Sequence, residues 1–148
     1  MIRGFFSETH LGSDDPAATK VPLVDAFLYL PCIEAHVTLQ FLMDTGADVS
    51  VLHPPDGLRL VRRAKDWEII RTYPAEYLGG AGGGHPYYGV PAVIMLSHED
   101  GATDSLTAPI WIADPRGRQE HESLFGRDLL AHFVLTFAQP DALSLERK

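Results

Sequence analysis

Short apolar runs, several with alternating polar positions, dominate the first half of the chain. Apolar Val37, Leu39 and Phe41 alternate with Thr38 and Gln40, close to the two-residue period of a strand with one buried face. The preceding run, PLVDAFLYL, is also rich in β-branched and aromatic residues, and the short segment PCIEA separates the two. The pattern predicts two adjacent strands.

Further short apolar runs follow at close spacing. VPAVIMLS and SLTAPIWIAD flank a polar turn, WEII and RTY are candidate strands, and SLFGRDLLAHFVLTF predicts a strand, a short helix over Asp128–Phe133 and a final strand. Many short strands with little helix are typical of a sandwich or barrel. We therefore expect an all-β fold, a closed or nearly closed β-barrel.

The length of 148 residues fits one compact domain. Residues 1–20 are rich in small and polar types and predict a flexible N-terminal lead-in. Residues 21–137 are expected to form the domain. Residues 138–148 form a C-terminal tail and a candidate interfacial strand.

Charge and cysteine content narrow the classes of function. The net charge of −8 and the pI of about 5.2 argue against a nucleic-acid partner, although five of the 12 basic residues lie between Arg59 and Arg71. This basic segment is expected to be a solvated face, with contact to an acidic partner as the alternative. The only cysteine, Cys32, allows no intrachain disulfide. Without an apolar leader or a membrane-length run, the default expectation is a cytoplasmic, free-standing protein with no membrane partner.

The segment from Phe41 to Ser50, FLMDTGADVS, carries the most informative chemistry. Asp44 stands directly after an apolar strand and before Thr45 and Gly46, although aspartate is disfavoured in strands and costly to bury. Asp-Thr-Gly alone is more often a simple turn. Its flanking residues change the interpretation.

Three motifs in one order resemble the retropepsin family, the retroviral-type aspartic proteases. LMDTGADVSVL is similar to the family signature, YLGGAGGGHPYYGV to its glycine-rich flap, and SLFGRDLL with HFVLTF to its closing segment. The resemblance spans about 100 residues, from Val37 to Phe137. It implies a β-barrel of the pepsin-half type and peptide-bond hydrolysis without metal or cofactor.

The resemblance also implies roles for individual residues. Asp44 would be the general acid or base, Thr45 would reach across to a partner chain, and Gly46 would leave its carbonyl close to substrate. Ala47 and Asp48 resemble positions that line the cleft and meet the substrate backbone. Arg127 resembles the arginine that pairs with the acid at the Asp48 position.

The expected flap tip is Gly80-Ala81-Gly82, which would contact substrate. Glycines there permit a tight turn and an opening motion. The extra glycines, followed by His85-Pro86, predict a longer flap than the compact family pattern, and a plain surface hairpin is the alternative.

The chain contains a single Asp-Thr-Gly, whereas the chemistry needs two carboxylates. A fainter internal echo, HESLFGRDLL, presents Phe125 where the second acid is needed. A two-fold homodimer would supply the second carboxylate, because a C2 interface sets a residue against its own copy. The partners expected are therefore a second copy and a peptide or protein substrate.

A second hypothesis is a binding or dimerisation module that keeps the fold with little turnover. Domains similar to retropepsins also occur in ubiquitin-receptor proteins, and fold does not fix function. A metal enzyme is disfavoured, because none of the 7 histidines forms an i, i+4 pair. The sequence offers no nucleophile-elbow motif at Ser50 or Ser123.

Overall fold

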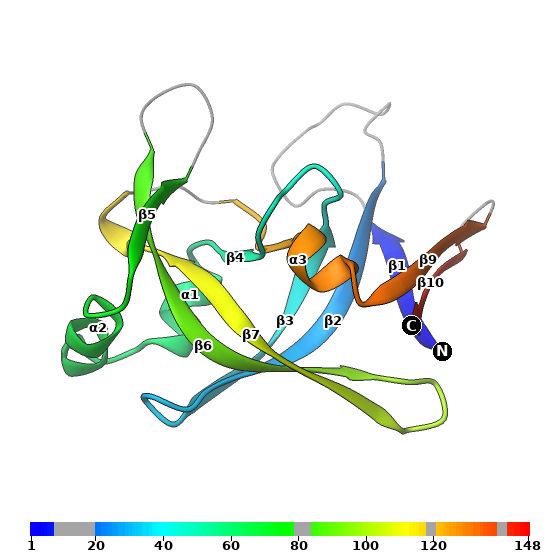
Figure 1. Cartoon of the computed structure of the whole chain (residues 1–148), viewed down its shortest axis with the longest axis horizontal. Helices are drawn as coiled ribbons and strands as arrows, with labels where there is room; N and C mark the ends of the chain where they lie inside the picture. Colours follow the sequence, from blue (N-terminus) through cyan, green and yellow to red (C-terminus); the bar gives the residue numbers. More distant parts are fainter. Residues whose placement is uncertain (8–19, 79–83, 118–120, 139–141) are drawn as a thin grey trace.

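A computed structural model describes residues 1–7, 20–78, 84–117, 121–138 and 142–148. Its described strands are β1 (Ile2–Ser7), β2 (Val21–Leu30), β3 (Ala35–Met43), β4 (Val51–Leu52), β5 (Ala75–Leu78), β6 (His85–Ser97), β7 (Thr103–Ala113), β8 (Leu124–Phe125), β9 (Phe133–Ala138) and β10 (Ala142–Arg147). The prediction of an all-β fold is correct (Figure 1).

Six of the strands form a hydrogen-bonded ring. The neighbours run β6-β7-β4-β8-β3-β2, and β6 also pairs with β2, which joins the two ends of this series. The strands β2 and β3 form the antiparallel pair predicted from their alternation, with Val24 opposite Phe41 and Leu28 opposite Val37. Alternate apolar residues of the two strands, among them Ala26 and Leu39, belong to one buried cluster, so the ring encloses a core.

Four short helical segments lie between the strands in the described ranges: α1 (Asp56–Leu60), α2 (Ala64–Ile70), η1 (Pro115–Gly117) and α3 (Arg127–Leu130). The expectation of a strand at WEII is wrong, because Trp67 and Ile70 lie one helical turn apart in α2 and are both buried. RTY forms a turn. The helix expected over Asp128–Phe133 ends at Leu130, and Phe133 already begins β9.

The first residues belong to the sheet, which corrects the expected lead-in over residues 1–20. Strand β1 pairs with β2 and with β10, and Ile2 is 1% exposed because its side chain enters the core. Residues 8–19 lie outside the described residues. The C-terminal tail does form a strand, β10, which pairs with β1 and β9 of the same chain. Both chain ends therefore lie close together at one side of the molecule (Figure 1).

One large apolar cluster fills the ring and extends under the terminal strands. Phe41 and Phe125 are fully buried at its centre, with ring centroids 5.7 Å apart in an edge-to-face arrangement. Leu143 and Leu145 from β10 join the same cluster. The core therefore extends beyond the 21–137 range expected from the sequence.

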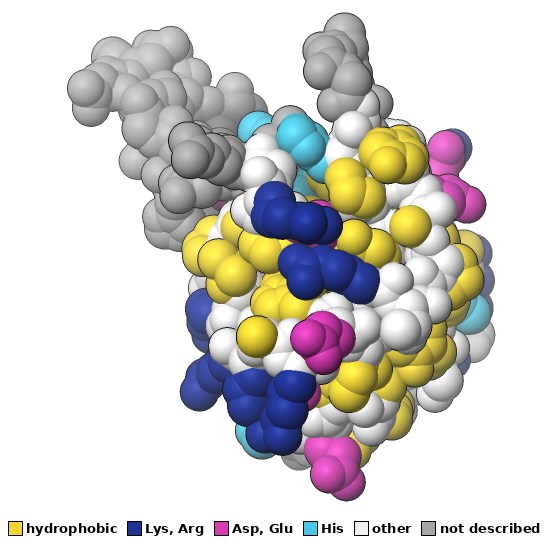
Figure 2. All heavy atoms as spheres, turned by 90° about the vertical axis from the view of Figure 1, so that its left-hand side faces the viewer, with side chains coloured by type: hydrophobic (Ala, Val, Ile, Leu, Met, Phe, Trp, Pro, Cys, Tyr) yellow, Lys and Arg dark blue, Asp and Glu magenta, His cyan; other side chains and the backbone are white. Residues whose placement is uncertain are grey.

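The basic segment lies on the face that carries α2, shown in Figure 2. Arg62, Arg63, Lys65 and Arg71 are exposed, and Arg63, the residue before α2, forms an ion pair with Asp66 in that helix. This arrangement agrees with the expected solvated face. None of the helices among the described residues combines the length and apolar character needed to cross a membrane.

Candidate active site

Asp44 lies where the chain leaves β3. Its backbone N–H donates to the Phe125 carbonyl at 3.0 Å, and its own carbonyl accepts the N–H of Ala47 at 3.2 Å. The carboxylate Oδ1 accepts the Gly46 N–H at 2.8 Å, a local turn that fixes the side-chain direction. The half-buried side chain is thus oriented by its own loop while remaining accessible.

The two segments that echo each other in sequence are neighbours in space. Strands β3 and β8 pair in parallel, with Met43 opposite Phe125. Beyond them, the Arg127 N–H donates to the Ala47 carbonyl at 2.8 Å. Gly126 lies so close to the loop that a Cβ there would stand 2.5 Å from the Val49 carbonyl oxygen. The loop after Asp44 therefore packs directly on the start of α3.

Ser50 and Asp128 clamp the far end of this loop. Ser50 is fully buried, its hydroxyl donates to Asp128 Oδ1 at 2.7 Å, and its N–H donates to Asp128 Oδ2 at 3.1 Å. The same hydroxyl accepts the Gly126 N–H at 2.8 Å. Sequence reasoning considered Ser50 only as a nucleophile. No local signal was available, because Asp128 lies 78 residues further along the chain.

Asp48 and Arg127 form an ion pair across the same loop. Their side chains are 81% and 61% exposed, so the pair lies in water and contributes little to stability. Thr45 is also exposed, and its hydroxyl has no hydrogen-bond partner within the described part of this single chain. Asp48 and Thr45 are thus exposed on this loop, and Asp44 is half-buried.

A cavity of about 540 Å³ opens beside the loop. Ala47, Val49, Val51 and Leu124 give it an apolar wall, and Leu78 closes it from the end of β5. Gly46 and Asp48 also line it, whereas Asp44 stands at the loop next to it. The cavity is therefore suited to an apolar group held near the Asp44 carboxylate.

The expected flap tip, Gly80-Ala81-Gly82, lies outside the described residues. The strands on either side of it, β5 and β6, pair antiparallel, with Leu78 opposite His85 and Tyr77 opposite Pro86. The hairpin strands therefore adjoin the cavity through Leu78.

A buried hydrogen-bond chain connects β6 to the wall of this cavity. Tyr87 Oη lies 2.8 Å from His53 Nε2, and His53 Nδ1 lies 2.8 Å from the Glu122 carbonyl oxygen. Because that carbonyl only accepts, Nδ1 carries the proton and neutral His53 accepts from Tyr87. Burial lowers the pKa of His53 and the nearby His121 adds to this, while the bond to Glu122 and the charge of Asp56 oppose it.

Another acid, Asp114, has a different environment at the end of β7. It is 2% exposed and accepts hydrogen bonds from Arg116 Nη2 and Tyr88 Oη, both at 2.8 Å. Arg71 Nε adds a longer contact of 3.3 Å. The bonds from Arg116 outweigh burial and hold the pKa of Asp114 well below its ordinary value. This acid fixes β6 and α2 to the chain after β7.

The described residues form no candidate metal site. No three His, Cys, Asp or Glu side chains among those residues gather as metal ligands would. What the loop offers is one accessible carboxylate, oriented by a backbone N–H, next to an apolar cavity.

Comparison with models of known protein families gives no match to this sequence, and comparison with curated proteins gives none either.

Proposed function

We propose that this protein is an aspartic endopeptidase of the retropepsin type, which hydrolyses peptide bonds as a homodimer. The observation that carries the proposal is the setting of Asp44. Its accessible carboxylate is oriented by the Gly46 N–H, on a loop clamped by Ser50 and Asp128, beside a cavity under a β-hairpin.

The chemistry requires a second carboxyl group close to the first. One carboxylate accepts a proton from the attacking water, while the other, in its protonated form, polarises the scissile carbonyl. Two carboxyl groups that close cannot both ionise, so they share a proton, as in aspartic proteases generally. This chain supplies Asp44 once, and a two-fold axis beside the loop would bring its copy alongside.

The remaining residues take supporting roles in this proposal. The exposed Thr45 hydroxyl would donate across the axis to the second chain, and Gly46 leaves room for substrate next to the acid. An extended peptide would lie along the cavity wall formed by Ala47 and Asp48 and be covered by the hairpin ending in Gly80-Ala81-Gly82.

The test compares wild-type protein with Asp44→Asn on a mixed peptide library at pH 3 to 7, with new amino termini counted by mass spectrometry. We expect cleavage by wild type and a loss of about 10³-fold or more in Asp44→Asn, because both acid–base steps need the carboxyl group. Glu68→Gln, an exposed change on α2, is the matched control and should cleave normally.

Mixing the two proteins tests the shared site. If each active centre needs two Asp44 residues, an equal mixture with free subunit exchange should retain about one quarter of the activity of wild type at the same total concentration. A pepstatin-type inhibitor should titrate one site per two chains. Linear loss of activity with the fraction of Asp44→Asn would reject the shared centre. No cleavage by a wild-type protein that sediments as a dimer would favour the binding module.

A further inference from the structure

A groove lies between the turn that joins β2 to β3 and the helical segments α1 and α2. It consists of two cavities, of about 320 and 370 Å³, which adjoin each other because both are lined by Ile33, Glu34, Arg63 and Asp66. Neither cavity shares a lining residue with the one beside the Asp44 loop. The groove is therefore separate from the candidate active site.

Part of the surface of this groove is apolar. Ile33 and Leu60 line it and are buried members of the main core. Ile69, which is 39% exposed, extends the apolar surface along α2, and the exposed Pro31 continues it on the turn after β2. The groove can therefore accept an apolar side chain of a bound partner.

The charged side chains along the groove are predominantly basic. Its lining includes Arg59, Arg62, Arg63 and Lys65, against the carboxylates of Glu34 and Asp66. Asp66 is buried and already accepts from Arg63 at 2.9 and 3.2 Å. Arg59 is also engaged, because it donates to the Thr38 carbonyl at 3.0 Å and pairs with Asp56 at 3.4 Å. These internal pairs leave two of the basic side chains to consider.

Arg62 and Lys65 carry positive charge that no ion pair within the described residues balances. Arg62 Nε donates to the Arg59 carbonyl at 3.0 Å, which holds the guanidinium in place while its terminal nitrogens have no partner in the described part of the chain. A group that is ordered in advance loses less entropy when it binds an acceptor. Glu34 offsets at most one of the two charges, so the groove keeps a positive excess on a chain whose net charge is −8.

We propose that this groove binds an acidic peptide segment of a partner protein, one that carries an apolar side chain between its carboxylates. The carboxylates would accept from the Arg62 guanidinium and the Lys65 ammonium group. The apolar side chain would pack on Ile33 and Ile69. Nucleic acid fits the groove less well, because the net charge of −8 repels phosphates beyond it and an apolar surface gives phosphates no contact.

Binding in this groove does not depend on catalysis at Asp44, so it is measured in Asp44→Asn protein. The probes are two nearly isosteric peptides that differ in charge, acetyl-Glu-Leu-Asp-Glu-amide and acetyl-Gln-Leu-Asn-Gln-amide, and binding is followed through backbone amide shifts by NMR. At low ionic strength, we expect the acidic peptide to shift the amides of Glu34, Arg62 and Lys65 and to bind about tenfold more tightly than the neutral one.

Two results of this titration would overturn the proposal. One is equal affinity of the two peptides, or shifts that avoid the three amides. The other is tighter binding of a short oligothymidylate than of the acidic peptide at the same amides, which would identify nucleic acid as the partner.

Variants of the exposed side chains test each contact. Arg62→Gln and Lys65→Gln should each weaken the acidic peptide about three- to tenfold, and the charge reversal Lys65→Glu should weaken it further. Ile69→Ser should weaken both peptides by a similar factor, because it removes the apolar contact that they share.

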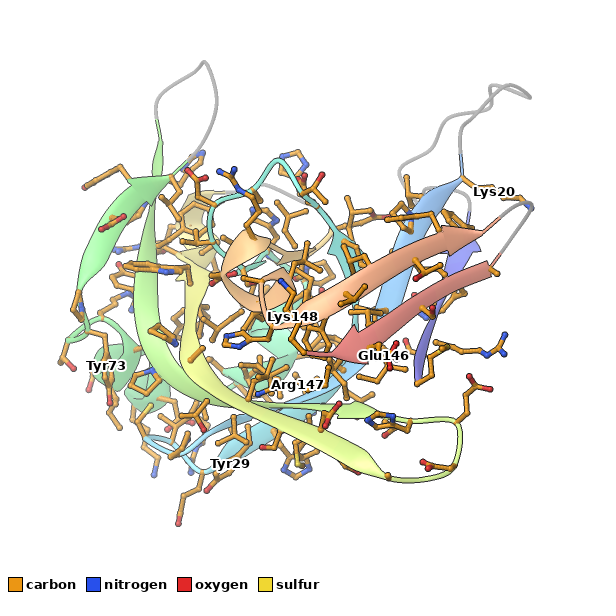
Figure 3. The ribbon with its side chains drawn as sticks, turned by 45° about the vertical axis from the view of Figure 1, so that its right-hand side comes forward. Lys20, Tyr29, Tyr73, Glu146, Arg147 and Lys148 are labelled. Carbon is orange, nitrogen blue, oxygen red and sulfur yellow. The ribbon has the colours of Figure 1, made fainter. Side chains whose placement is uncertain are left out.

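Lys148→Gln is the matched control, because it removes the same charge at a residue that does not line the groove (Figure 3). Its affinity for the acidic peptide should stay within about twofold of the parent protein. Since these charged side chains are exposed, melting temperatures should agree within about 2 °C, which separates binding from folding. Unchanged affinity in Arg62→Gln and Lys65→Gln, or an equal loss in Lys148→Gln, would contradict the proposal.

Discussion

Asp44 and Asp114 are two carboxylates placed at strand ends in very different surroundings. Asp114 is buried and accepts from two arginines and a tyrosine, so its bonding capacity is filled. Asp44 is half-buried, and the backbone N–H of Gly46 holds one of its oxygens. The comparison separates an acid that stabilises the fold from one whose remaining lone pairs stay available for chemistry.

The largest expected effect is the difference in unfolding free energy between two variants, Asp114→Asn and Asp44→Asn. Asp114→Asn should lower the free energy of unfolding by about 2–4 kcal/mol, because it removes the negative charge and one of the two acceptor oxygens that two guanidinium groups share. Asp44→Asn should change it by less than about 0.5 kcal/mol, as for other accessible positions. Urea unfolding followed by circular dichroism measures both. Equal destabilisation would remove the distinction between the two acids.

The loss caused by Asp114→Asn should also depend on pH. The folded-state pKa of Asp114 is lowered, so its contribution is present above the unfolded value of 3.8 and disappears as pH falls through the folded value. The difference between wild type and variant should therefore be constant from pH 7 to 5 and shrink below about pH 4. A difference that grows on acidification would contradict the arginine-paired arrangement.

A smaller effect is expected at the clamp that holds the Asp44 loop. Ser50→Ala removes a buried hydroxyl bonded to Asp128 and leaves the Gly126 N–H without its acceptor. We expect a loss of about 1–3 kcal/mol in unfolding free energy. Under the proposed function we also expect a fall in kcat of about tenfold with little change in KM, because the acid is misplaced rather than removed.

Ser97→Ala, an exposed change at the end of β6, is the matched control for the clamp. Full activity of Ser50→Ala together with the expected loss of stability would show that the clamp serves the fold alone.

The smallest effect concerns His53. Because burial lowers its folded-state pKa, neutral His53 contributes stability that is present above its ordinary value of 6.5 and is lost as pH falls through the folded value. Wild type should therefore lose more unfolding free energy than His53→Gln between pH 7 and pH 5. His121, Asp56, Tyr87 and Glu122 face this ring, so the comparison is made against the variant at each pH. Parallel pH curves would argue against the buried neutral ring.

The all-β class and the β2–β3 pair were predictable, because alternation of apolar residues is a local property of the sequence. The same holds for the strand, glycine and helix around Gly126. The Asp48–Arg127 ion pair was anticipated from motif resemblance, and it is present. What the sequence missed depends on distant partners. Strand β1 pairs with both β2 and the distant β10, and WEII lies in a helix from which Trp67 and Ile70 both reach the core.

The polar networks were also beyond the sequence. No local pattern around Ser50 predicts that its hydroxyl will hydrogen-bond to Asp128, which lies 78 residues away in the chain. The partners of Asp114 come from α2, β6 and η1, so its role emerges only when those elements pack together. The alternation that predicts strands carries no information about which polar residues will meet.

The position of β10 between β1 and β9 has a consequence for how the molecule is made. Strand β10 leaves the ribosome after the other described strands of this sheet, and its partner β1 leaves before them. Pairing β1 with β10 closes a loop that contains most of the chain. The conformational entropy lost in closing it comes before the contacts form, so this pairing should form late. Until β10 pairs with it, part of β1 has an unpaired strand edge. Such an edge can pair with another molecule, so the nascent chain is prone to aggregate at this stage.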